Sequence, residues 1–235
     1  MDDTIHSARV ASAAPTSALL APAGPGGRAV PLTERSAVFD HCAVLLFPRT
    51  LAAGLAELRR CGFAPLPLTP STVVRGRLSA RHGFDPAESD IHITRLPVRL
   101  ADGRHHPAVE VFLFPRDSPA FRHDIEDAEV AHDFEAHTAF VMSRPDPAAL
   151  SELIAAWRGE AGLLWEGGGH NPHEGGPSGA TVLYFVRGHA APAQRRRFEL
   201  HCAGDLRPFI DRLPYEAEAV DRAYRTWRAF SGVPA

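Results

Sequence analysis

Residues 165–202 read WEGGGHNPHEGGPSGATVLYFVRGHAAPAQRRRFELHC, and the prediction of the fold starts from this stretch. Residues 167–179 contain six glycines and two prolines in thirteen positions, which leaves the backbone no regular element to join. The pattern predicts a mobile loop, and loops of this kind often carry function. The two histidines of the loop, His170 and His173, are therefore candidate functional residues.

Two strands are expected after the loop. Residues 182–186 are β-branched, aromatic or otherwise apolar, and residues 197–202 alternate polar and apolar side chains with the period of a strand. The alternation places Glu199 and His201 on the same polar face. A carboxylate on a strand that lines a cavity is a suitable ligand for a hard or borderline metal ion.

The composition is that of a globular protein with a proper core, since 45% of the 235 residues are apolar. The net charge of −3 and the spread of the basic residues along the chain predict no nucleic-acid partner. No apolar run approaches the roughly 20 residues that span a bilayer, and the acidic N-terminus is a poor secretory signal. Three cysteines, an odd number, suit reduced thiols. We expect a cytoplasmic protein with no membrane partner, and the sequence leaves a homodimer open.

Residues 1–35 are rich in Ala, Pro, Ser and Gly, and we expect a flexible tail there. The folded part is expected over residues 36–205, with a first module over residues 36–115. The elements predicted in this module are a strand over residues 37–47, a helix over 50–60 that Thr50 caps and Gly62 ends, a loop with several arginines, and a hairpin of strands over 90–100 and 106–114.

The pattern repeats over residues 133–205. The elements predicted there are a strand over residues 134–142, a helix from about 145 to 157 and the two closing strands, preceded by a linker over 115–133 and followed by a C-terminal helical extension over 206–235. His41 and His137 occupy the same place in the first strand of each copy, and Glu110 and Glu199 the same place in the last strand. The long period indicates duplication within one domain rather than a repeat array.

A tandem unit of strand, helix and three strands, with His in the first strand and Glu in the last, resembles the vicinal oxygen chelate superfamily. The resemblance implies an α+β fold in which two tandem βαβββ modules form a cupped mixed sheet around one metal. The second half is most similar to the extradiol catechol dioxygenases, through a glycine-rich loop with histidines, then Tyr184-Phe185, then Glu199. Two-module members of that group include L-DOPA dioxygenases of actinobacterial antibiotic pathways.

The resemblance also implies roles for individual residues. His41, His137 and Glu199 correspond to the Fe(II) ligands of an enzyme that inserts both atoms of O2 into a catechol, such as L-DOPA. Tyr184 corresponds to a tyrosine that lines the site. The residues expected to serve as acid and base are His170 or His173 on the glycine loop, with His106 on the last strand of the first module as the next candidate.

Two other interpretations stay open. If Glu110 is a fourth ligand, the set His, Glu, His, Glu resembles glyoxalase I-like lyases and isomerases that use Ni, Co or Zn. The histidines of the glycine loop favour the dioxygenase over this alternative. Small-molecule-binding resistance proteins share the fold but lack the metal residues, so the ligand-type residues argue against that third interpretation.

Basic residues supply two further expectations. One arginine of the first module is expected to bind a carboxylate of the substrate through a bidentate pair of hydrogen bonds. The candidates are Arg75, Arg77, Arg81 and Arg95. The run 195–197, by contrast, is expected to be a solvated strand face.

Overall fold

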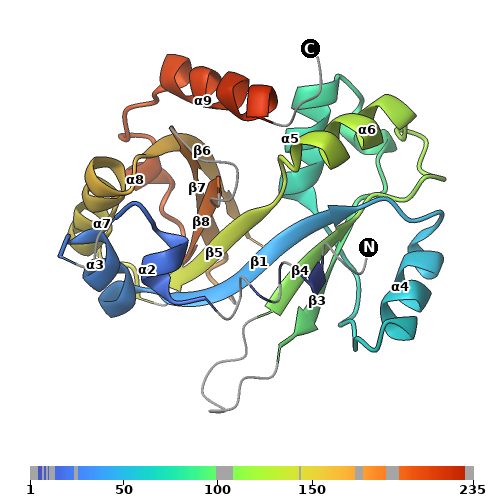
Figure 1. Cartoon of the computed structure of the whole chain (residues 1–235), viewed down its shortest axis with the longest axis horizontal. Coiled ribbons are helices and arrows are strands. Elements are labelled where there is room, and N and C mark those ends of the chain that lie inside the picture. The colour runs from blue at the N-terminus through green and yellow to red at the C-terminus, as the bar shows by residue number, and fades with distance from the viewer. Residues whose placement is uncertain are drawn as a thin grey trace. The chain divides into compact units, whose positions relative to one another are not determined.

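A computed structural model of the chain describes residues 5–6, 8, 10, 14–23, 26–98, 108–142, 144–172, 177–188 and 196–230 (Figure 1). The chain divides into two compact units. Unit 1 comprises Met1–Ala13 and His41–Ala136, and unit 2 comprises Ala14–Asp40 and His137–Ala235. No helix among the described residues combines the length and the hydropathy needed to cross a membrane.

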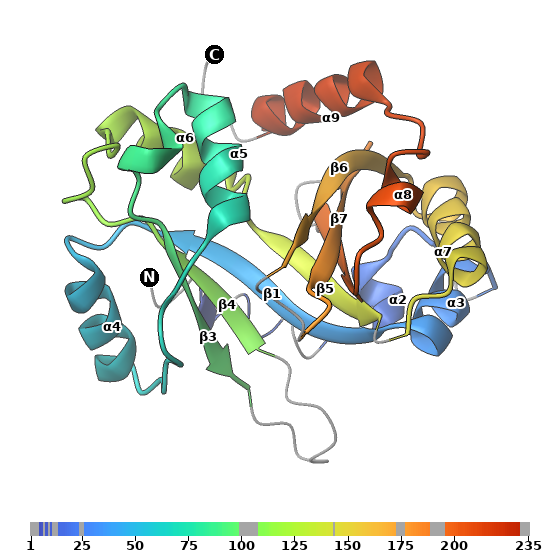
Figure 2. The same cartoon turned by 180° about the vertical axis from the view of Figure 1, so that it is seen from behind.

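The sheet of unit 1 has the strand order β2-β3-β4-β1, and Figures 1 and 2 label β3, β4 and β1. Its elements are β1 (Val38–Leu46, in unit 1 from His41), α4 (Leu51–Arg60), β2 (Thr69–Pro70), α5 (Thr72–His82), a short 3-10 turn (Pro86–Glu88), β3 (His92–Pro97), β4 (Ala108–Leu113) and α6 (His123–His132). Strand β1 is parallel to β4, whereas β3 is antiparallel to both β2 and β4. The predicted order of strand, helix and three strands is therefore present, with α5 inserted in it. The predicted hairpin turn lies outside the described residues.

Helix α4 covers one face of this sheet. Its first turn donates a backbone N–H to the Thr50 hydroxyl at 3.0 Å, which is the predicted N-cap. Gly62 follows the helix at φ +83, a left-handed conformation that glycine adopts without strain. Within the helix, a Cβ on Gly54 would lie 3.0 Å from the Pro48 side chain and 3.4 Å from that of Leu113, so glycine allows the helix to pack closely on the segment that follows β1.

Helices α5 and α6 cover the other face, and both correct the sequence prediction of an arginine-rich loop and a linker. Val74 and Leu78, one helical turn apart on α5, are buried with Phe112 of the sheet and Ile125 of α6. Helix α5 ends at Gly83, whose φ is +68. Each helix buries few apolar residues, so the periodic signal in the sequence is weak and polar residues dominate it.

Buried ion pairs connect α5 with residues of α6 and of the segment that follows α6. Arg81 lies 2.7 Å from Glu129 and 2.9 Å from Glu135, and Arg77 donates to Glu135 at 3.0 Å. His82 Nε2 lies 2.7 Å from the Glu129 carboxylate. Both glutamate side chains are almost fully buried. Because a buried carboxylate is costly without a partner, these basic residues are needed to hold α5 and α6 together.

Unit 2 repeats the topology of unit 1, with the strand order β5-β8-β7-β6. Its elements are α2 (Thr16–Leu19), α3 (Ala29–Ser36), β5 (His137–Met142), α7 (Pro147–Glu160), β6 (Leu163–Asn171), β7 (Ala180–Arg187), β8 (Arg197–Ala203), α8 (Arg207–Ile210) and α9 (Ala217–Phe230). Strand β5 is parallel to β8, and β7 is antiparallel to β6 and β8. The predicted α+β class with two copies of a βαβββ module is thus confirmed.

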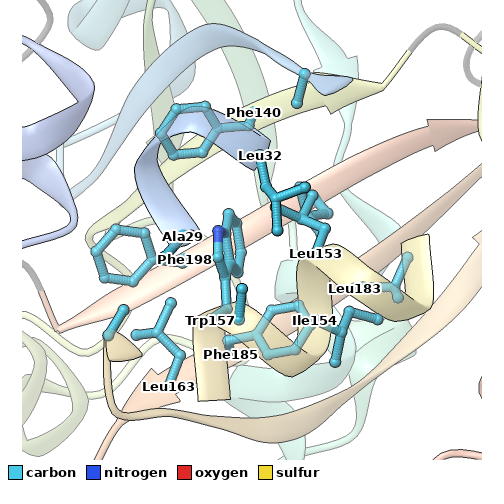
Figure 3. Packing of buried hydrophobic residues seen from close by; sticks show 14 of the residues in the cluster. Ala29, Leu32, Phe140, Leu153, Ile154, Trp157, Leu163, Leu183, Phe185 and Phe198 are labelled. Atoms are coloured by element: carbon cyan, nitrogen blue, oxygen red, sulfur yellow. The ribbon is translucent and has the colours of Figure 1, made fainter. Parts of the chain in front are cut away.

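The core of unit 2 is built around Trp157 of α7, which is fully buried. Its ring makes edge contacts with Phe140, Phe185 and Phe198, at centroid distances of 5.9, 5.3 and 6.1 Å (Figure 3). The indole N–H donates to the Thr33 hydroxyl at 2.8 Å. A buried indole therefore has its polar atom satisfied by a residue of the N-terminal region.

The expected flexible tail is wrong for the N-terminal residues that the structure describes in unit 2. Helix α3 packs on α7, and buried Ala29 and Leu32 belong to the same core as Trp157 (Figure 3). Arg187 adds a polar anchor, because its guanidinium donates to the carbonyl of Leu19 at 3.3 Å. Burial lowers the pKa of Arg187 to about 10, which leaves it charged at neutral pH. The composition concealed two short helices, whose buried apolar residues Leu19, Ala29, Val30 and Leu32 belong to this core.

The glycine run of residues 167–169 corrects a second expectation, because it is part of strand β6 and not of a loop. A β-bulge between Trp165 and Gly167 sets the register, and Gly167 has φ +134, which disfavours any other residue. At Gly168 a Cβ would lie 2.3 Å from the carbonyl oxygen of Val182. Gly168 thus permits the close pairing of β6 with β7.

Candidate metal centre

In unit 1, His41 and Glu110 form a buried pair. Strand β1 places Ala43 beside Glu110 in the parallel register, and His41 lies on the same face as Ala43 because strand side chains alternate. His41 Nε2 lies 3.3 Å from Glu110 Oε2, and the two residues are 3% and 9% exposed. The last strand of the module thus brings its carboxylate to the histidine of the first strand.

Unit 2 contains the equivalent pair, His137 and Glu199. The register places Ala139 beside Glu199, as Ala43 lies beside Glu110. His137 Nε2 lies 3.2 Å from Glu199 Oε2, and the two residues are 0% and 4% exposed. The repeat seen in the sequence therefore extends to a repeated side-chain contact.

Each pair concentrates ionisable groups where water is largely excluded. A buried carboxylate or imidazolium is stable only with a partner, hydrogen bonds or a metal ion. Imidazole nitrogen and carboxylate oxygen are both ligands of divalent metals such as Zn, Ni and Fe. Cys202 is not a competing donor, because it lies three positions from Glu199 on β8 and packs in the apolar core on the other face of the strand. Burial, together with the charge of Glu199, raises the pKa of its thiol to about 12. The donors of unit 2 at this place are therefore nitrogen and oxygen.

Tyr184 lies beside the pair of unit 2. It is opposite Glu199 in the antiparallel register of β7 and β8, and therefore on the same face. Its ring centroid is 6.0 Å from that of His137, with an interplanar angle of 85°. The structure thus brings Tyr184, His137 and Glu199 together.

His170 does not join these residues. It lies on β6 opposite Thr181 of β7, and its Nδ1 is 3.5 Å from the Thr181 hydroxyl oxygen. Thr181 is three positions from Tyr184 on a regular strand, so its side chain is directed to the opposite face of the sheet. His173 and His106 lie outside the described residues, so the structure gives no position for either.

The four candidate arginines have different surroundings. Arg77 and Arg81 are engaged by the buried carboxylates of Glu129 and Glu135. Arg95 lies opposite Glu110 in the antiparallel register of β3 and β4, on the face that carries the carboxylate. Arg75 lies on helix α5 with Arg77 and Arg81, so Arg95 is the candidate that stands opposite a site residue in the sheet.

Arg197 was missed by the sequence reasoning. A solvated strand face was expected over residues 195–197, but the side chain of Arg197 is only 1% exposed. It donates to both carboxylate oxygens of Glu166, at 2.9 and 2.8 Å, and its guanidinium lies over the Tyr184 ring at 4.9 Å. The alternation of residues 197–202 does place Arg197 on the face of Glu199, and this signal could have identified it.

No protein-family model and no curated protein matches the sequence. Among solved structures, one methylmalonyl-CoA epimerase aligns with a TM-score of 0.38 and 15% identity, over 72% of this chain and 98% of that chain. The Streptomyces coelicolor methylmalonyl-CoA epimerase in complex with 2-nitronate-propionyl-CoA gives 0.36 and 16%, over 72% and 99%. A glyoxalase I mutant from Zea mays gives 0.20 and 13%, over 69% of this chain and 45% of that chain. Likenesses at such low scores carry no conclusion about activity.

Proposed function

We propose that this chain is a divalent-metal-dependent enzyme of the vicinal oxygen chelate type, with the metal held by His41, His137 and Glu199. The observation that carries the proposal is the duplicated, buried His–carboxylate pair, one in each module. Each of the three ligands offers one donor atom. A duplicated pair is suited to one shared ion, because a single module supplies too few protein ligands for a stable site.

The reaction that we propose is proton transfer at a carbon next to a carbonyl group, as in an isomerase or epimerase. Glu110 supports this choice, since it stands in the same relation to His41 as Glu199 does to His137. A second carboxylate supplies a base beside the ligands. The absence of His170 from the face of Glu199 weakens the alternative in which that histidine acts as base.

In the proposed mechanism the chain's own residues handle the proton. A bound divalent ion would supply Lewis acidity toward the substrate carbonyl. Glu110 takes the proton from the adjacent carbon, so the C–H bond breaks and its electron pair moves toward the carbonyl to give an enolate. In an isomerisation, protonated Glu110 returns the proton to the neighbouring carbon, which restores its carboxylate. In an epimerisation, an acid on the opposite face of the enolate supplies the new proton, and Glu110 releases its own proton to solvent.

The Fe(II) extradiol dioxygenase is the second candidate. It is favoured by the donor types, because two histidines and one carboxylate are the ligands of many non-haem Fe(II) oxygenases. Its substrates would be O2 and a catechol such as L-DOPA. In that case the base would have to come from residues other than His170, among which His173 and His106 lie outside the described residues.

One experiment separates the candidates. The apoprotein is loaded anaerobically with Fe(II), Ni(II), Co(II) or Zn(II), and the bound metal is counted. Each form is then given methylmalonyl-CoA in D2O, the glutathione hemithioacetal of methylglyoxal, or L-DOPA with air. We expect one metal per chain and deuterium exchange or isomerisation with Ni(II), Co(II) or Zn(II). Oxygen uptake and a yellow ring-fission product with Fe(II) alone would select the second candidate, and failure to bind any of the metals would overturn both.

A further inference from the structure

A chain of contacts in unit 2 connects the C-terminal helix α9 with the His137–Glu199 pair. Tyr224 of α9 donates its hydroxyl to Glu166 on β6, and Glu166 accepts two hydrogen bonds from Arg197 on β8. The guanidinium of Arg197 lies over the ring of Tyr184, whose edge-to-face partner is His137. Figure 2 shows α9 beside β6 and β7, the strands that carry Glu166 and Tyr184.

Local backbone geometry explains how Glu166 reaches this position. It is the residue between Trp165 and Gly167, where the pairing of β6 with β7 shifts by a β-bulge. A bulge re-aims a side chain that regular alternation would place elsewhere. The bulge thus serves to present a carboxylate both to Arg197 in the sheet and to Tyr224 on the helix.

The Arg197–Glu166 pair is too buried to be treated as a surface ion pair, with side-chain exposures of 1% and 14%. Such a pair adds little stability compared with apolar residues of the same size, so its value lies in fixing geometry. The planar guanidinium of Arg197 fixes two partners. Its edge donates hydrogen bonds to the Glu166 carboxylate, and its face stacks on the Tyr184 ring. The ring that it holds is the one in contact with His137.

We propose that Arg197 is a positioning residue, which Glu166 and Tyr224 hold in place and which fixes Tyr184 against the His137–Glu199 pair. Helix α9 then contributes to this half of the site through Tyr224, and displacement of the helix would make the position of Tyr184 less fixed. The functional consequence rests on the proposed function, because it assumes that His137 and Glu199 bind metal. Removing a residue that orients a metal ligand without binding the metal itself typically lowers metal affinity by about 10- to 100-fold.

The test uses two readouts, of which only one needs a metal. The chain has three tyrosines, so protein labelled with 3-fluorotyrosine gives a simple 19F spectrum that Tyr→Phe variants assign. Arg197→Met is expected to shift or broaden the Tyr184 resonance of the apoprotein. It is also expected to lower the affinity for Co(II), measured by competition with a chelator, by about 10- to 100-fold. Arg197→Lys keeps the charge but loses the planar guanidinium. Its Tyr184 resonance and its Co(II) affinity should lie between those of the wild type and Arg197→Met.

Arg158→Met is the matched control. Arg158 pairs at 2.8 Å with Glu216, next to the start of α9, so the variant removes an Arg–Glu pair near this helix, more exposed than the Arg197–Glu166 pair, without touching Tyr184. We expect the control to leave the Tyr184 resonance and the Co(II) affinity unchanged. An unchanged resonance in folded Arg197→Met, or equal effects of the two variants, would overturn the proposal. If Arg197→Met does not fold, Tyr224→Phe serves instead and must move the Tyr184 resonance. If the wild-type chain binds no Co(II), only the metal site is refuted. The 19F spectra of the apoprotein still test whether Arg197 positions Tyr184.

Discussion

The carboxylate of Glu199 lies 3.2 Å from Nε2 of His137, and the first module repeats this relation between Glu110 and His41 at 3.3 Å. In both modules the first and last strands are parallel neighbours, so the sheet topology itself brings the two side chains together. The contact is therefore a property of the module. The two copies then differ in the residue opposite the carboxylate, which is Arg95 in unit 1 and Tyr184 in unit 2.

The two carboxylates are expected to respond differently to the same substitution. Glu199→Gln removes a charged ligand, so it should lower the metal content of the purified protein strongly. Glu110→Gln should retain the metal and lower turnover by about 10²- to 10⁴-fold, the usual contribution of a general base. Elemental analysis and the deuterium-exchange rate measure the two effects. Equal loss of metal in both variants would mean that Glu110 is a fourth ligand.

Arg95 is expected to recognise an acidic substrate, because it lies opposite Glu110 on the face of the candidate base. Arg95→Met should raise KM for a carboxylate-bearing substrate and leave kcat nearly unchanged, since the contact is made in the ground state and in the transition state alike. Steady-state kinetics with an acidic substrate and its methyl ester provide the measurement. If the variant and the wild type discriminate equally between acid and ester, Arg95 has no such role.

The buried ion pairs of α5 and α6 are expected to matter for stability and not for metal binding. Glu135→Gln removes a buried counter-charge from both Arg77 and Arg81, of which Arg81 keeps its pair with Glu129. Breaking a buried pair typically costs about 3–5 kcal/mol of unfolding free energy. Glu126→Gln is the control, because its partner Arg116 is 48% exposed and surface pairs contribute about 0–1 kcal/mol. Urea unfolding measures both. Similar midpoints for the two variants would show that burial does not decide the strength of these pairs.

The sequence was sufficient for the module repeat, because His41 and His137 stand at equivalent places in the first strands of the two copies, and Glu110 and Glu199 at equivalent places in the last strands. It was insufficient where tertiary contacts override local signals. Helix α5 shows this, since its arginines suggest a solvated loop in the sequence but form ion pairs with carboxylates that are distant along the chain.

Arg197 shows the same limit at the site. Its position on the face of Glu199 follows from strand alternation, but its burial depends on Glu166, whose side chain is re-aimed by a bulge. Bulges are not encoded by periodicity, so the residues that they bring together cannot be derived from it.

The glycine run provides a direct test of strand against loop. Gly168→Ala would place a Cβ 2.3 Å from the Val182 carbonyl oxygen, so β6 and β7 must separate locally, whereas Gly169→Ala meets no atom within 4 Å. We expect Gly168→Ala to lower the unfolding free energy by about 1–3 kcal/mol or more, the usual cost of overpacking, and Gly169→Ala to change it little. Thermal and urea unfolding of the two variants provide the comparison. A mobile loop would accept alanine equally well at both positions, so equal stabilities would refute the pairing of this part of β6 with β7.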